Sequence, residues 1–307
     1  MQNPAFDPGL TQKYTGNLRR AINKDGTFNV RRRGATWRDF HPYLHLIDMG
    51  WAPFFALLFL GYLAVNTLFA LAYFWLGPGH LQGAEASTQA GRFFNDFFFS
   101  AHTLSTVGYG SISPRSVASN VVASVESLVG VLGFAVATGL LFGRVSRPSA
   151  KFGFSEKILV APYQDITSLQ FRVVNRRRND LMELEARVLL MTVEAGNGQP
   201  VRNYRQLQLE RERVLFLPLT WTVVHPIDST SPLYGLTEED VRRLQAEFMI
   251  LIKAYDDTFS QTVIARYSYR YNEIAWNRRF APAFSVDSDG DLVLELQKVG
   301  EIGDSAP

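Results

Sequence analysis

The stretch Thr106-Val107-Gly108-Tyr109-Gly110 lies between two long apolar segments, at residues 51–76 and 117–142. Glycine has no Cβ, so the two glycines of this stretch can adopt positive φ without strain, and successive carbonyl groups can then point to the same side. The valine and the tyrosine face the other way and are expected to pack behind the loop. The pentapeptide therefore predicts a loop whose inner surface is a row of backbone oxygens.

A row of carbonyl oxygens is what a dehydrated potassium ion requires, because the oxygens replace the water that the ion loses. A loop of this composition is typical of potassium-selective filters. We expect K⁺ to be bound at Thr106, Val107, Gly108 and Tyr109, with the Thr106 hydroxyl adding one more ring of ligands and Gly110 completing the filter. One loop cannot surround an ion, so the sequence predicts a symmetric homotetramer. No cofactor is expected besides the permeant K⁺.

Both apolar segments are long enough to cross a bilayer. Residues 51–76 contain no charged residue, and residues 117–142 contain only Glu126. Between them the aromatic segment 92–103 makes a helix of about 18 Å, too short to span, which predicts a re-entrant pore helix. Buried core helices of a soluble protein are the alternative, but two such runs rarely occur together in a soluble domain. The predicted pore domain covers residues 51–148.

The basic residues predict an orientation in the membrane, although the net charge of +2 says little. The outer flanks of the two apolar segments are rich in Lys and Arg, whereas the loop between them has only Arg92 and Arg115. Lys and Arg favour the cytoplasmic side, so both termini are expected in the cytoplasm and the protein in the plasma membrane. The chain has no cysteine, which excludes disulfides and thiolate metal sites. Its polar first 50 residues show no signal peptide.

Residues 36–50 are expected to form a helix in the cytoplasmic interface, just before the first span. Apolar residues recur at helical spacing from Trp37 to Ile47, with charged residues and histidines between them, a pattern typical of amphipathic helices. Pro42 either kinks this helix or begins it. An ordinary polar linker is the alternative. Residues 1–35 would then be a cytoplasmic N-terminal segment.

Residues 149–307 show the period-two alternation of short β-strands, separated by turn signals. One short helix is expected at 237–245, with Thr237 as its cap. Many short strands and few helices predict a cytoplasmic all-β sandwich. His225 and Asp228 are interpreted as structural rather than catalytic, because no nucleophile with its base, metal cluster or phosphate-binding loop accompanies them. We therefore expect no enzyme.

Several motifs occur in a definite order along the chain. They are Trp37-Arg38-Asp39; Phe97-Phe98-Phe99-Ser100 leading to the filter; Thr138-Gly139-Leu140-Leu141-Phe142-Gly143-Arg144 with Ser146-Arg147-Pro148; Trp221 with His225-Pro226-Ile227-Asp228; Ser231-Pro232-Leu233-Tyr234-Gly235; and Ala265-Arg266 followed by Asn272-Glu273-Ile274-Ala275-Trp276. Across nearly its whole length the chain thus resembles the prokaryotic inwardly rectifying potassium channel family. The resemblance implies a two-span subunit, a homotetramer, an immunoglobulin-like cytoplasmic domain traversed by a long pore, and a bacterial inner membrane. It implies no nucleic-acid partner.

One face of the second apolar segment is expected to line the central cavity. Val131, Phe134, Thr138 and Phe142 are spaced by three, four and four residues, which places them on one helix face. Four Phe142 rings meeting on an axis would form a hydrophobic gate that closes by dewetting, and the resemblance places the family's bundle-crossing aromatic there. A Phe142 packed against the outer helix is the alternative. The glycines of this segment either ease bending or let helices pack closely.

The resemblance also implies roles at the cytoplasmic side. The loop before Ala265-Arg266 would line a second constriction, where Asp256 and Asp257 attract cations; solvated turn carboxylates are the alternative. Basic clusters at a membrane surface bind anionic headgroups, and phosphoinositides act at this place in the family and tend to inhibit its prokaryotic members. Alternatively these residues only set the topology. The lipid-binding candidates are Arg38, Arg144, Arg147 and Lys151.

Two positions depart from the family pattern. Strongly rectifying relatives carry an acid at the position of Phe134, so weak rectification is expected here, with Glu126 as one candidate substitute. Many relatives carry Glu at the position of His102, where it supports the filter from behind. We expect His102 to pair with Glu126 in this role, because ionisable groups inside a membrane need partners, and to make conduction pH-dependent. A hydrogen-bonded histidine that does not titrate is the alternative.

Two other functions compete with a potassium channel. A poorly selective cation pore is disfavoured by the complete filter sequence. A membrane-tethered sensor with a vestigial pore is disfavoured for the same reason, although regulation by the cytoplasmic domain fits both readings. We therefore expect a potassium-selective channel for passive K⁺ transport, gated at the inner helices and modulated by the cytoplasmic domain and by anionic lipids.

Overall fold

The computed structural model describes residues 9–11, 20–34, 36, 41–146, 151–195 and 199–303. The chain divides into two compact units. One is formed by residues 34–147, and the other by residues 1–33 together with residues 148–307. The first unit is helical and the second is mainly β.

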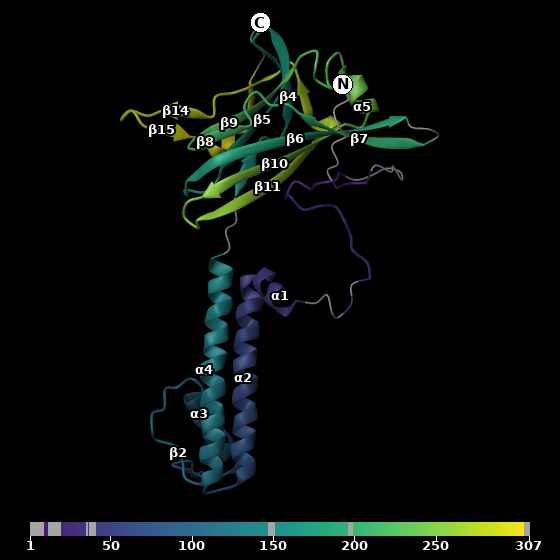
Figure 1. The fold of residues 1–307 in the computed structure, drawn as a ribbon. Helices are drawn as coiled ribbons and strands as arrows, with labels where there is room; N and C mark the ends of the chain where they lie inside the picture. Colours follow the sequence, from purple (N-terminus) through teal and green to yellow (C-terminus); the bar gives the residue numbers. More distant parts are fainter. Residues whose placement is uncertain are drawn as a thin grey trace. The chain divides into compact units, whose positions relative to one another are not determined.

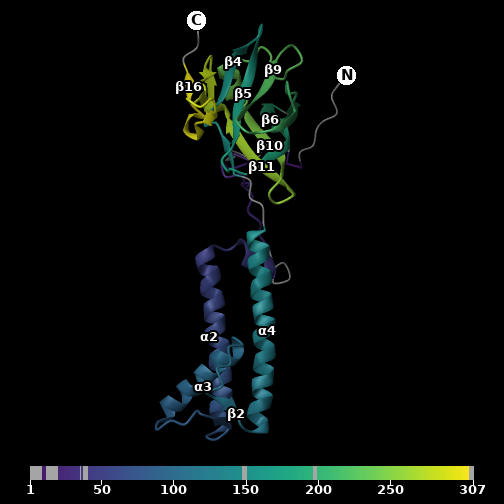
Figure 2. The same cartoon turned by 90° about the vertical axis from the view of Figure 1, so that its left-hand side faces the viewer.

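Between residues 41 and 146 the first unit consists of helices joined by short loops: α1 (Pro42–Asp48), α2 (Trp51–Leu76), α3 (Gln89–Leu104) and α4 (Val117–Val145). Both α2 and α4 are long and apolar enough to cross a membrane. Figures 1 and 2 show α2 and α4 side by side, with α3 against them toward the ends that lie away from α1. The predicted order of outer helix, pore helix and inner helix is confirmed.

Local sequence explains where these helices begin and end. The Ser116 hydroxyl oxygen accepts a bond from the Ser119 N–H at 3.1 Å, and Ser119 Oγ accepts one from the Ser116 N–H at 3.1 Å, so α4 begins with a capping box. The Thr88 hydroxyl oxygen accepts a bond from the Gly91 N–H at 3.1 Å and caps α3. After α2 the chain turns at Gly77 with a φ of 96°, a conformation that glycine adopts without strain.

The helix before the first span is shorter than predicted. It begins at Pro42, in the first turn, where the missing N–H of proline is tolerated. Because His41 is extended, with a φ of −106° and a ψ of 98°, a continuous helix kinked at Pro42 is wrong and the helix that begins there is confirmed. The earlier part of the expected helix, residues 37–40, lies outside the described residues.

A short ladder closes the segment that holds α3 and the 106–110 loop. β1 (Leu81–Gln82) pairs antiparallel with β2 (Ser113–Pro114). Phe69 and Tyr73 of α2 pack with Phe99 of α3 in a buried cluster, where the Tyr73 and Phe99 rings meet edge to face with centroids 5.1 Å apart. The pore helix is thus anchored to the outer helix by apolar packing.

In the described part of the second unit, two five-stranded sheets enclose one core. One sheet has the order β11-β10-β6-β7 with β8 paired to β6, and the other has the order β12-β4-β5-β3 with β9 paired to β5. The strands of the first sheet are β6 (Leu181–Ala195), β7 (Pro200–Leu207), β8 (Arg213–Phe216), β10 (Glu247–Asp256) and β11 (Gln261–Arg270). Those of the second are β3 (Phe152–Phe154), β4 (Ile158–Tyr163), β5 (Ile166–Asn175), β9 (Thr220–Ile227) and β12 (Ile274–Trp276).

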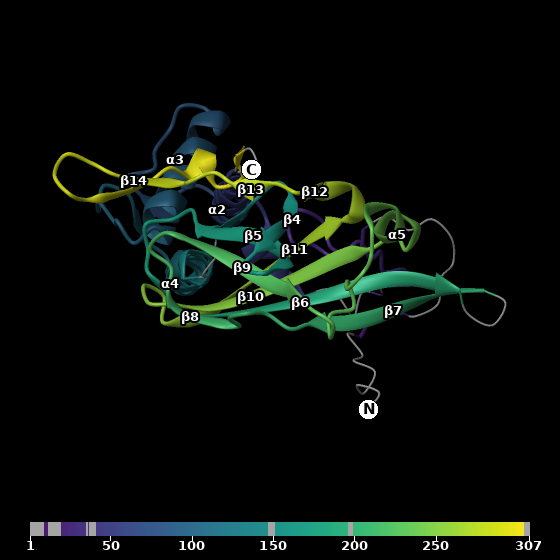
Figure 3. The ribbon, with the colours of Figure 1, turned by 90° about the horizontal axis from the view of Figure 1, so that it is seen from above.

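The alternation of apolar residues explains how the two sheets meet. Alternate residues of β6, such as Leu184 and Val188, are buried together with Phe248 of β10 and with Ile158 and Phe171 of the other sheet. Figure 3 shows β5 and β9 on one side and β6 and β10 on the other. The predicted β-rich C-terminal domain is confirmed.

Smaller elements complete the domain. The predicted helix is observed as α5 (Glu238–Arg243), where the Thr237 hydroxyl oxygen accepts a bond from the Asp240 N–H at 3.3 Å. Short pairs join β13 (Arg279–Phe280) to β16 (Ile302–Gly303) and β14 (Phe284–Val286) to β15 (Leu292–Leu294). The β14–β15 hairpin projects from the sandwich (Figure 3).

The N-terminal segment packs on the sandwich, which the sequence did not indicate. Ile22 is buried, and the Ala21 N–H donates to both carboxylate oxygens of Glu247 at 2.9 and 3.1 Å. Lys24 Nζ forms an ion pair with Glu273 at 2.9 Å. Burial raises the pKa of Glu247 above its usual value, while the N–H groups it accepts from act in the opposite direction.

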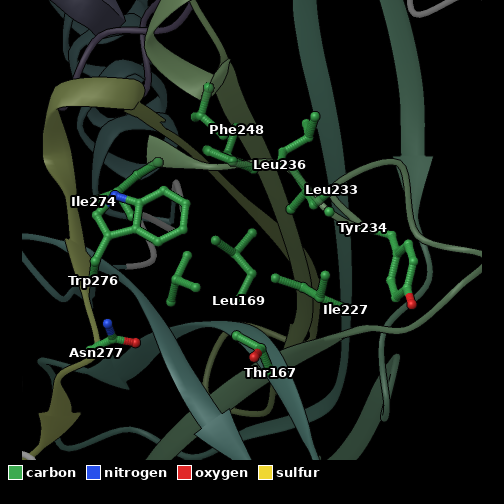
Figure 4. Close-up of a pocket in the computed structure, with 13 residues that line it drawn as sticks. Thr167, Leu169, Ile227, Leu233, Tyr234, Leu236, Phe248, Ile274, Trp276 and Asn277 are labelled. Atoms are coloured by element: carbon green, nitrogen blue, oxygen red, sulfur yellow. The ribbon is translucent and has the colours of Figure 1, made fainter. Parts of the chain in front are cut away.

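A pocket of about 290 Å³, lined by apolar and uncharged polar residues, lies between β5, β12 and the 233–236 segment. Figure 4 shows the Trp276 ring on one side of the pocket, with Ile227 and Leu233 on the other. Two lining residues, Leu169 and Phe248, belong to the sandwich core. Its described lining has no charged side chain, and its volume falls just below the roughly 300–1,000 Å³ of ligand sites. We interpret it as an open part of the core.

Candidate ion pathway

The 106–110 loop leaves the C-terminal end of α3 and folds back on it. The N–H groups of Val107 and Gly108 both donate to the His102 carbonyl oxygen, at 2.9 and 3.1 Å. Gly108 and Gly110 have φ of 53° and 81°, as predicted for a loop of aligned carbonyl groups. Thr106 also has a positive φ, 62°, which is strained for a β-branched residue and was not predicted.

The side chains behind the loop are only partly covered within one subunit. The Tyr109 ring stands perpendicular to the His102 ring, with centroids 4.8 Å apart. Even so, Tyr109 is 73% exposed and Val107 is 51% exposed. The expected packing behind the loop is therefore incomplete in a single chain.

The predicted pair of His102 and Glu126 is not observed. The Glu126 carboxylate accepts hydrogen bonds from the Tyr73 hydroxyl, at 2.7 Å, and from the Ser100 hydroxyl. The physical reason is helix phase: His102 follows Ser100 by two residues, about 200° around the helix axis, so it points away from the side that faces Glu126. Among the described ring contacts, His102 has one, with Tyr109, and this contact places it beside the 106–110 loop.

The four candidate pore-lining residues of α4 share an unpacked face. Phe134 is 77% exposed and Phe142 is 72% exposed, and Val131 and Thr138 are also exposed. The centre of this face lies about a third of a turn from the side of α4 that carries the buried Glu126. Phe142 is therefore not packed against α2 within the single chain, and its role as a gate stays a prediction.

The glycines of α4 have different surroundings. A Cβ at Gly130 would collide with the Leu104 carbonyl oxygen, so α3 and α4 touch there. At Gly133 and Gly139 no described atom lies within 4 Å of such a Cβ. Close packing thus explains Gly130 within the subunit, and the other two are open.

Arg144 is hydrogen-bonded within the chain, which the sequence did not indicate, and its assignment as a lipid ligand stays a prediction. Its Nη1 donates to the carbonyl oxygens of Leu46, at 2.5 Å, and Ile47, at 2.9 Å, and its Nη2 donates to that of Met49, at 2.6 Å. The guanidinium also lies over the rings of Trp51 and Phe54. These carbonyls belong to the end of α1, where a helix has unpaired acceptors and attracts cations.

The remaining lipid-binding candidates are placed only in part. Lys151 is exposed in the second unit. Arg38 and Arg147 lie outside the described residues.

The two candidate acids of the cytoplasmic constriction differ. Asp256 is fully buried and accepts bonds from Asn179 Nδ2 at 2.9 Å and from the Phe259 N–H at 3.4 Å. It holds the turn between β10 and β11 and cannot present charge to a pore, so its predicted role was wrong. Asp257, the next residue, is exposed.

His225 and Asp228 serve separate local purposes. His225 Nδ1 donates to the Gln208 carbonyl at 2.5 Å, and Nε2 accepts from the Ser231 hydroxyl at 2.8 Å. Burial lowers the pKa of His225. Asp228 accepts from the Thr230 N–H at 2.8 Å. Across the described residues no group of three His, Cys, Asp or Glu side chains forms a metal-binding cluster.

Two membrane helices, a short helix between them that leads into the 106–110 loop, and a following β-rich domain together define an ion-channel subunit. The family model described as "Ion channel" matches residues 54–147, and the model described as "Inward rectifier potassium channel C-terminal domain" matches residues 152–304.

The curated relatives agree with these family models. The chain is 36% identical to the inward rectifier potassium channel Kirbac3.1 of Paramagnetospirillum magnetotacticum, over 92% of this chain and 95% of that protein. It is 28% identical to the human ATP-sensitive inward rectifier potassium channel 14, over 90% of this chain and 68% of that one. Its identity to the human G protein-activated inward rectifier potassium channel 1 is 26%, over 93% and 62% of the two chains.

The chain therefore belongs to the inward rectifier potassium channel family. It is a membrane protein with two spans and not an enzyme.

Proposed function

We propose that four copies of this chain assemble around one axis and conduct K⁺ passively through the 106–110 loops, across a plasma membrane with both termini in the cytoplasm. The positive φ of Gly108 and Gly110 supports this, because it lets successive carbonyl groups point to one side. The exposure of Val107 and Tyr109 in the single chain supports the assembly, since neighbouring subunits would cover these side chains. K⁺ would be held at Thr106 and at the three residues that follow.

The gate of this pathway lies at Phe142. Its exposure, on the same face of α4 as Val131, Phe134 and Thr138, supports a hydrophobic constriction below a cavity lined by those residues. Such constrictions stop ions by dewetting. With Phe134 in place of an acid, cationic blockers find no carboxylate at that depth, so rectification by this route is weak.

Regulation acts from the cytoplasmic side. Asp257 remains a candidate for an acidic ring at a second constriction, because it is exposed at the β10–β11 turn. Lys151, together with Arg38 and Arg147, remains a candidate for anionic lipid headgroups. The in-chain hydrogen bonds of Arg144 and the burial of Asp256 favour structural roles for these two residues.

The experiment that tests the channel is K⁺ uptake into liposomes containing the purified protein, with Na⁺ and Ba²⁺ as controls. Uptake that favours K⁺ over Na⁺ and stops with Ba²⁺ supports the proposal. If the wild type is silent, Phe142→Ala is expected to restore uptake by widening the gate. A folded Phe142→Ala variant that also admits no K⁺ would contradict both the pathway and the gate.

Adding phosphoinositide to the same liposomes tests the basic candidates. We expect uptake to change, and Lys151→Gln to reduce the size of the change. An unaltered response in that variant would remove Lys151 from the lipid site.

A further inference from the structure

A buried polar cluster joins the three membrane helices behind the filter. Its members are Asn66 and Tyr73 of α2, Ser100 of α3 and Glu126 of α4, and each is at most 2% exposed. Polar groups inside a membrane bundle are rare, and when present they usually serve function. This cluster therefore fixes the positions of the three helices relative to one another.

Glu126 is the centre of the cluster. The Tyr73 hydroxyl donates to its Oε2 at 2.7 Å, and the Ser100 hydroxyl donates to its Oε1. Ser100 Oγ also lies 3.2 Å from both the carbonyl and the side-chain oxygens of Asn66, whose Nδ2 donates to the Tyr62 carbonyl at 2.7 Å. Each carboxylate oxygen of Glu126 is therefore bonded to a hydroxyl, one on the outer helix and one on the pore helix.

A second contact lies one turn further along both helices. Gly130 follows Glu126 by four residues, and Leu104 follows Ser100 by four. The backbones touch at this point, because a Cβ on Gly130 would collide with the Leu104 carbonyl oxygen. The pore helix is thus held to the inner helix at two points about 6 Å apart along the axis.

The turn of α3 between these two points is the one that carries the filter. His102 lies between Ser100 and Leu104, and its carbonyl oxygen accepts the N–H groups of Val107 and Gly108. A shift of this turn against α4 therefore moves the first carbonyl groups of the loop. An ion cage that depends on the number and positions of its oxygens is sensitive to such a shift.

We propose that Glu126, together with Ser100, Tyr73 and Gly130, forms a clamp that positions the filter and so determines how strongly the channel prefers K⁺ to Na⁺. The inference rests on the proposed function of the 106–110 loop and extends it to residues outside that loop. Glu126 is a positioning residue, because it acts through Ser100 of α3. The clamp replaces the pair of Glu126 with His102 that the sequence predicted.

The test compares full-length variants in liposomes. Ser100→Ala and Tyr73→Phe each remove one hydroxyl donor, and Glu126→Gln leaves a single acceptor oxygen where two hydroxyls must be accepted. Thr67→Ala is the matched control, because the Thr67 hydroxyl bonds only to the Leu63 carbonyl of its own helix in the described hydrogen bonds. The quantity measured is the ratio of initial K⁺ and Na⁺ uptake rates, which does not depend on how much active protein is inserted.

We expect Ser100→Ala and Glu126→Gln to lower this ratio at least fivefold, Tyr73→Phe to lower it less, and Thr67→Ala to leave it unchanged. The clamp is wrong if the two stronger variants assemble like the wild type and keep its ratio within twofold. If Ser100→Ala or Glu126→Gln fails to assemble, the uptake ratio of Tyr73→Phe, the mildest of the three variants, is compared with that of the wild type in its place.

A second measurement does not require an open gate. The midpoint of thermal unfolding in detergent is expected to be higher in K⁺ than in Na⁺ for the wild type, because bound ions stabilise the folded filter. Ser100→Ala should lose this difference and Thr67→Ala should keep it. If Ser100→Ala lowers the unfolding midpoint equally in K⁺ and in Na⁺, Ser100 has a merely structural role and the proposal is overturned. If the wild type neither takes up K⁺ faster than Na⁺ nor unfolds at a higher temperature in K⁺ than in Na⁺, the filter assignment is contradicted, and the clamp with it.

Discussion

Asp256 and Asp257 are adjacent in sequence and have opposite surroundings. The first is buried under hydrogen bonds from Asn179 and from the Phe259 N–H, and the second is exposed. A buried acceptor stabilises a turn only while its donors are satisfied, and removing it leaves those donors without a partner. At the scale of one residue, burial thus decides whether a carboxylate stabilises a fold or remains available to cations.

The first prediction separates these two acids. Asp256→Ala should lower the free energy of unfolding by about 1–3 kcal/mol, because Asn179 Nδ2 and the Phe259 N–H lose their acceptor. Asp257→Ala, the matched control, should change it by less than about 0.5 kcal/mol. Thermal unfolding of the full-length protein measures both. Equal losses in the two variants would contradict the assigned environments.

The second prediction concerns pH and His225. Burial holds the pKa of His225 below its usual value of 6.5, so the unfolded chain binds a proton more readily than the folded one. The free energy of unfolding should therefore fall as the pH drops below about 6.5 and continue to fall until the folded pKa is passed. Glu247 acts in the opposite direction at lower pH, because its folded pKa is raised and the folded state takes up the proton first.

The measurement is the unfolding midpoint between pH 7.5 and 5.5. His225→Gln should be less stable than the wild type at pH 7.5 but should lose less stability on acidification, since glutamine does not titrate. His41→Gln, at an exposed position outside the sandwich, should follow the wild type. If the unfolding midpoint of His225→Gln falls with pH as steeply as that of the wild type, groups other than His225 cause the pH dependence.

At the scale of elements, Arg144 joins the short helix α1 to the inner helix. Three carbonyl oxygens at the end of α1 accept from one guanidinium, which also stacks on Trp51 and Phe54. A seven-residue helix has little stability of its own, so its position depends on such contacts. The candidate gate residue Phe142 lies two residues before Arg144, which places this junction at the end of the expected pore.

The third prediction is that Arg144→Lys loosens α1. Lysine keeps the charge but lacks the planar fork that reaches several carbonyls and stacks on rings. The free energy of unfolding should fall by about 1–2 kcal/mol, and hydrogen exchange of the α1 amides should become faster. Arg115→Lys, at an exposed arginine, is the control and should alter neither. Unchanged exchange in α1 would show that the guanidinium does not hold the helix.

At the scale of the whole molecule, one subunit leaves apolar surfaces of its membrane helices uncovered. The apolar face of α4 and the side chains behind the filter are exposed in the single subunit, so neighbouring copies would complete both. In the proposed homotetramer, residues on that face would act only once four copies surround the axis.

The fourth prediction tests this arrangement through rectification. Phe134→Glu would place four carboxylates around the cavity, where Mg²⁺ and polyamines entering from the cytoplasm would bind and block outward current. The ratio of inward to outward current in planar bilayers with internal Mg²⁺ should be close to one in the wild type and should rise severalfold in Phe134→Glu. Phe134→Gln has the same shape without the charge and should resemble the wild type. Equal ratios in the Glu and Gln variants would mean that position 134 does not face the pore.

Features that depend on local composition could be predicted from the sequence. Uncharged runs of sufficient length indicated both spans, and the missing Cβ of Gly108 and Gly110 indicated the positive φ that is observed. The period-two alternation indicated the β-rich domain, and Thr237 indicated the cap of α5. Each of these properties arises from residues that are close together in the chain.

The contacts that the sequence did not indicate concern partners that are far apart in the chain. Arg144 contacts residues nearly a hundred positions earlier, and Asp256 accepts from Asn179, 77 positions away. A basic residue near a membrane and an acid in a turn have the same sequence signature whether they face solvent or the chain. The burial that distinguishes them is set by packing, which no local pattern encodes.

The sequence by itself determined the two membrane helices, the pore helix, the glycine conformation of the 106–110 loop and the β-rich domain, because apolar length, periodicity and the missing Cβ of glycine act locally along the backbone. Only the tertiary structure decided that Glu126 bonds to Ser100 and Tyr73 rather than to His102. Helix phase places Ser100 toward α4 and His102 toward Tyr109, and the close approach of Leu104 to Gly130 sets the relation between α3 and α4. Those contacts exist only once three separate helices have packed together.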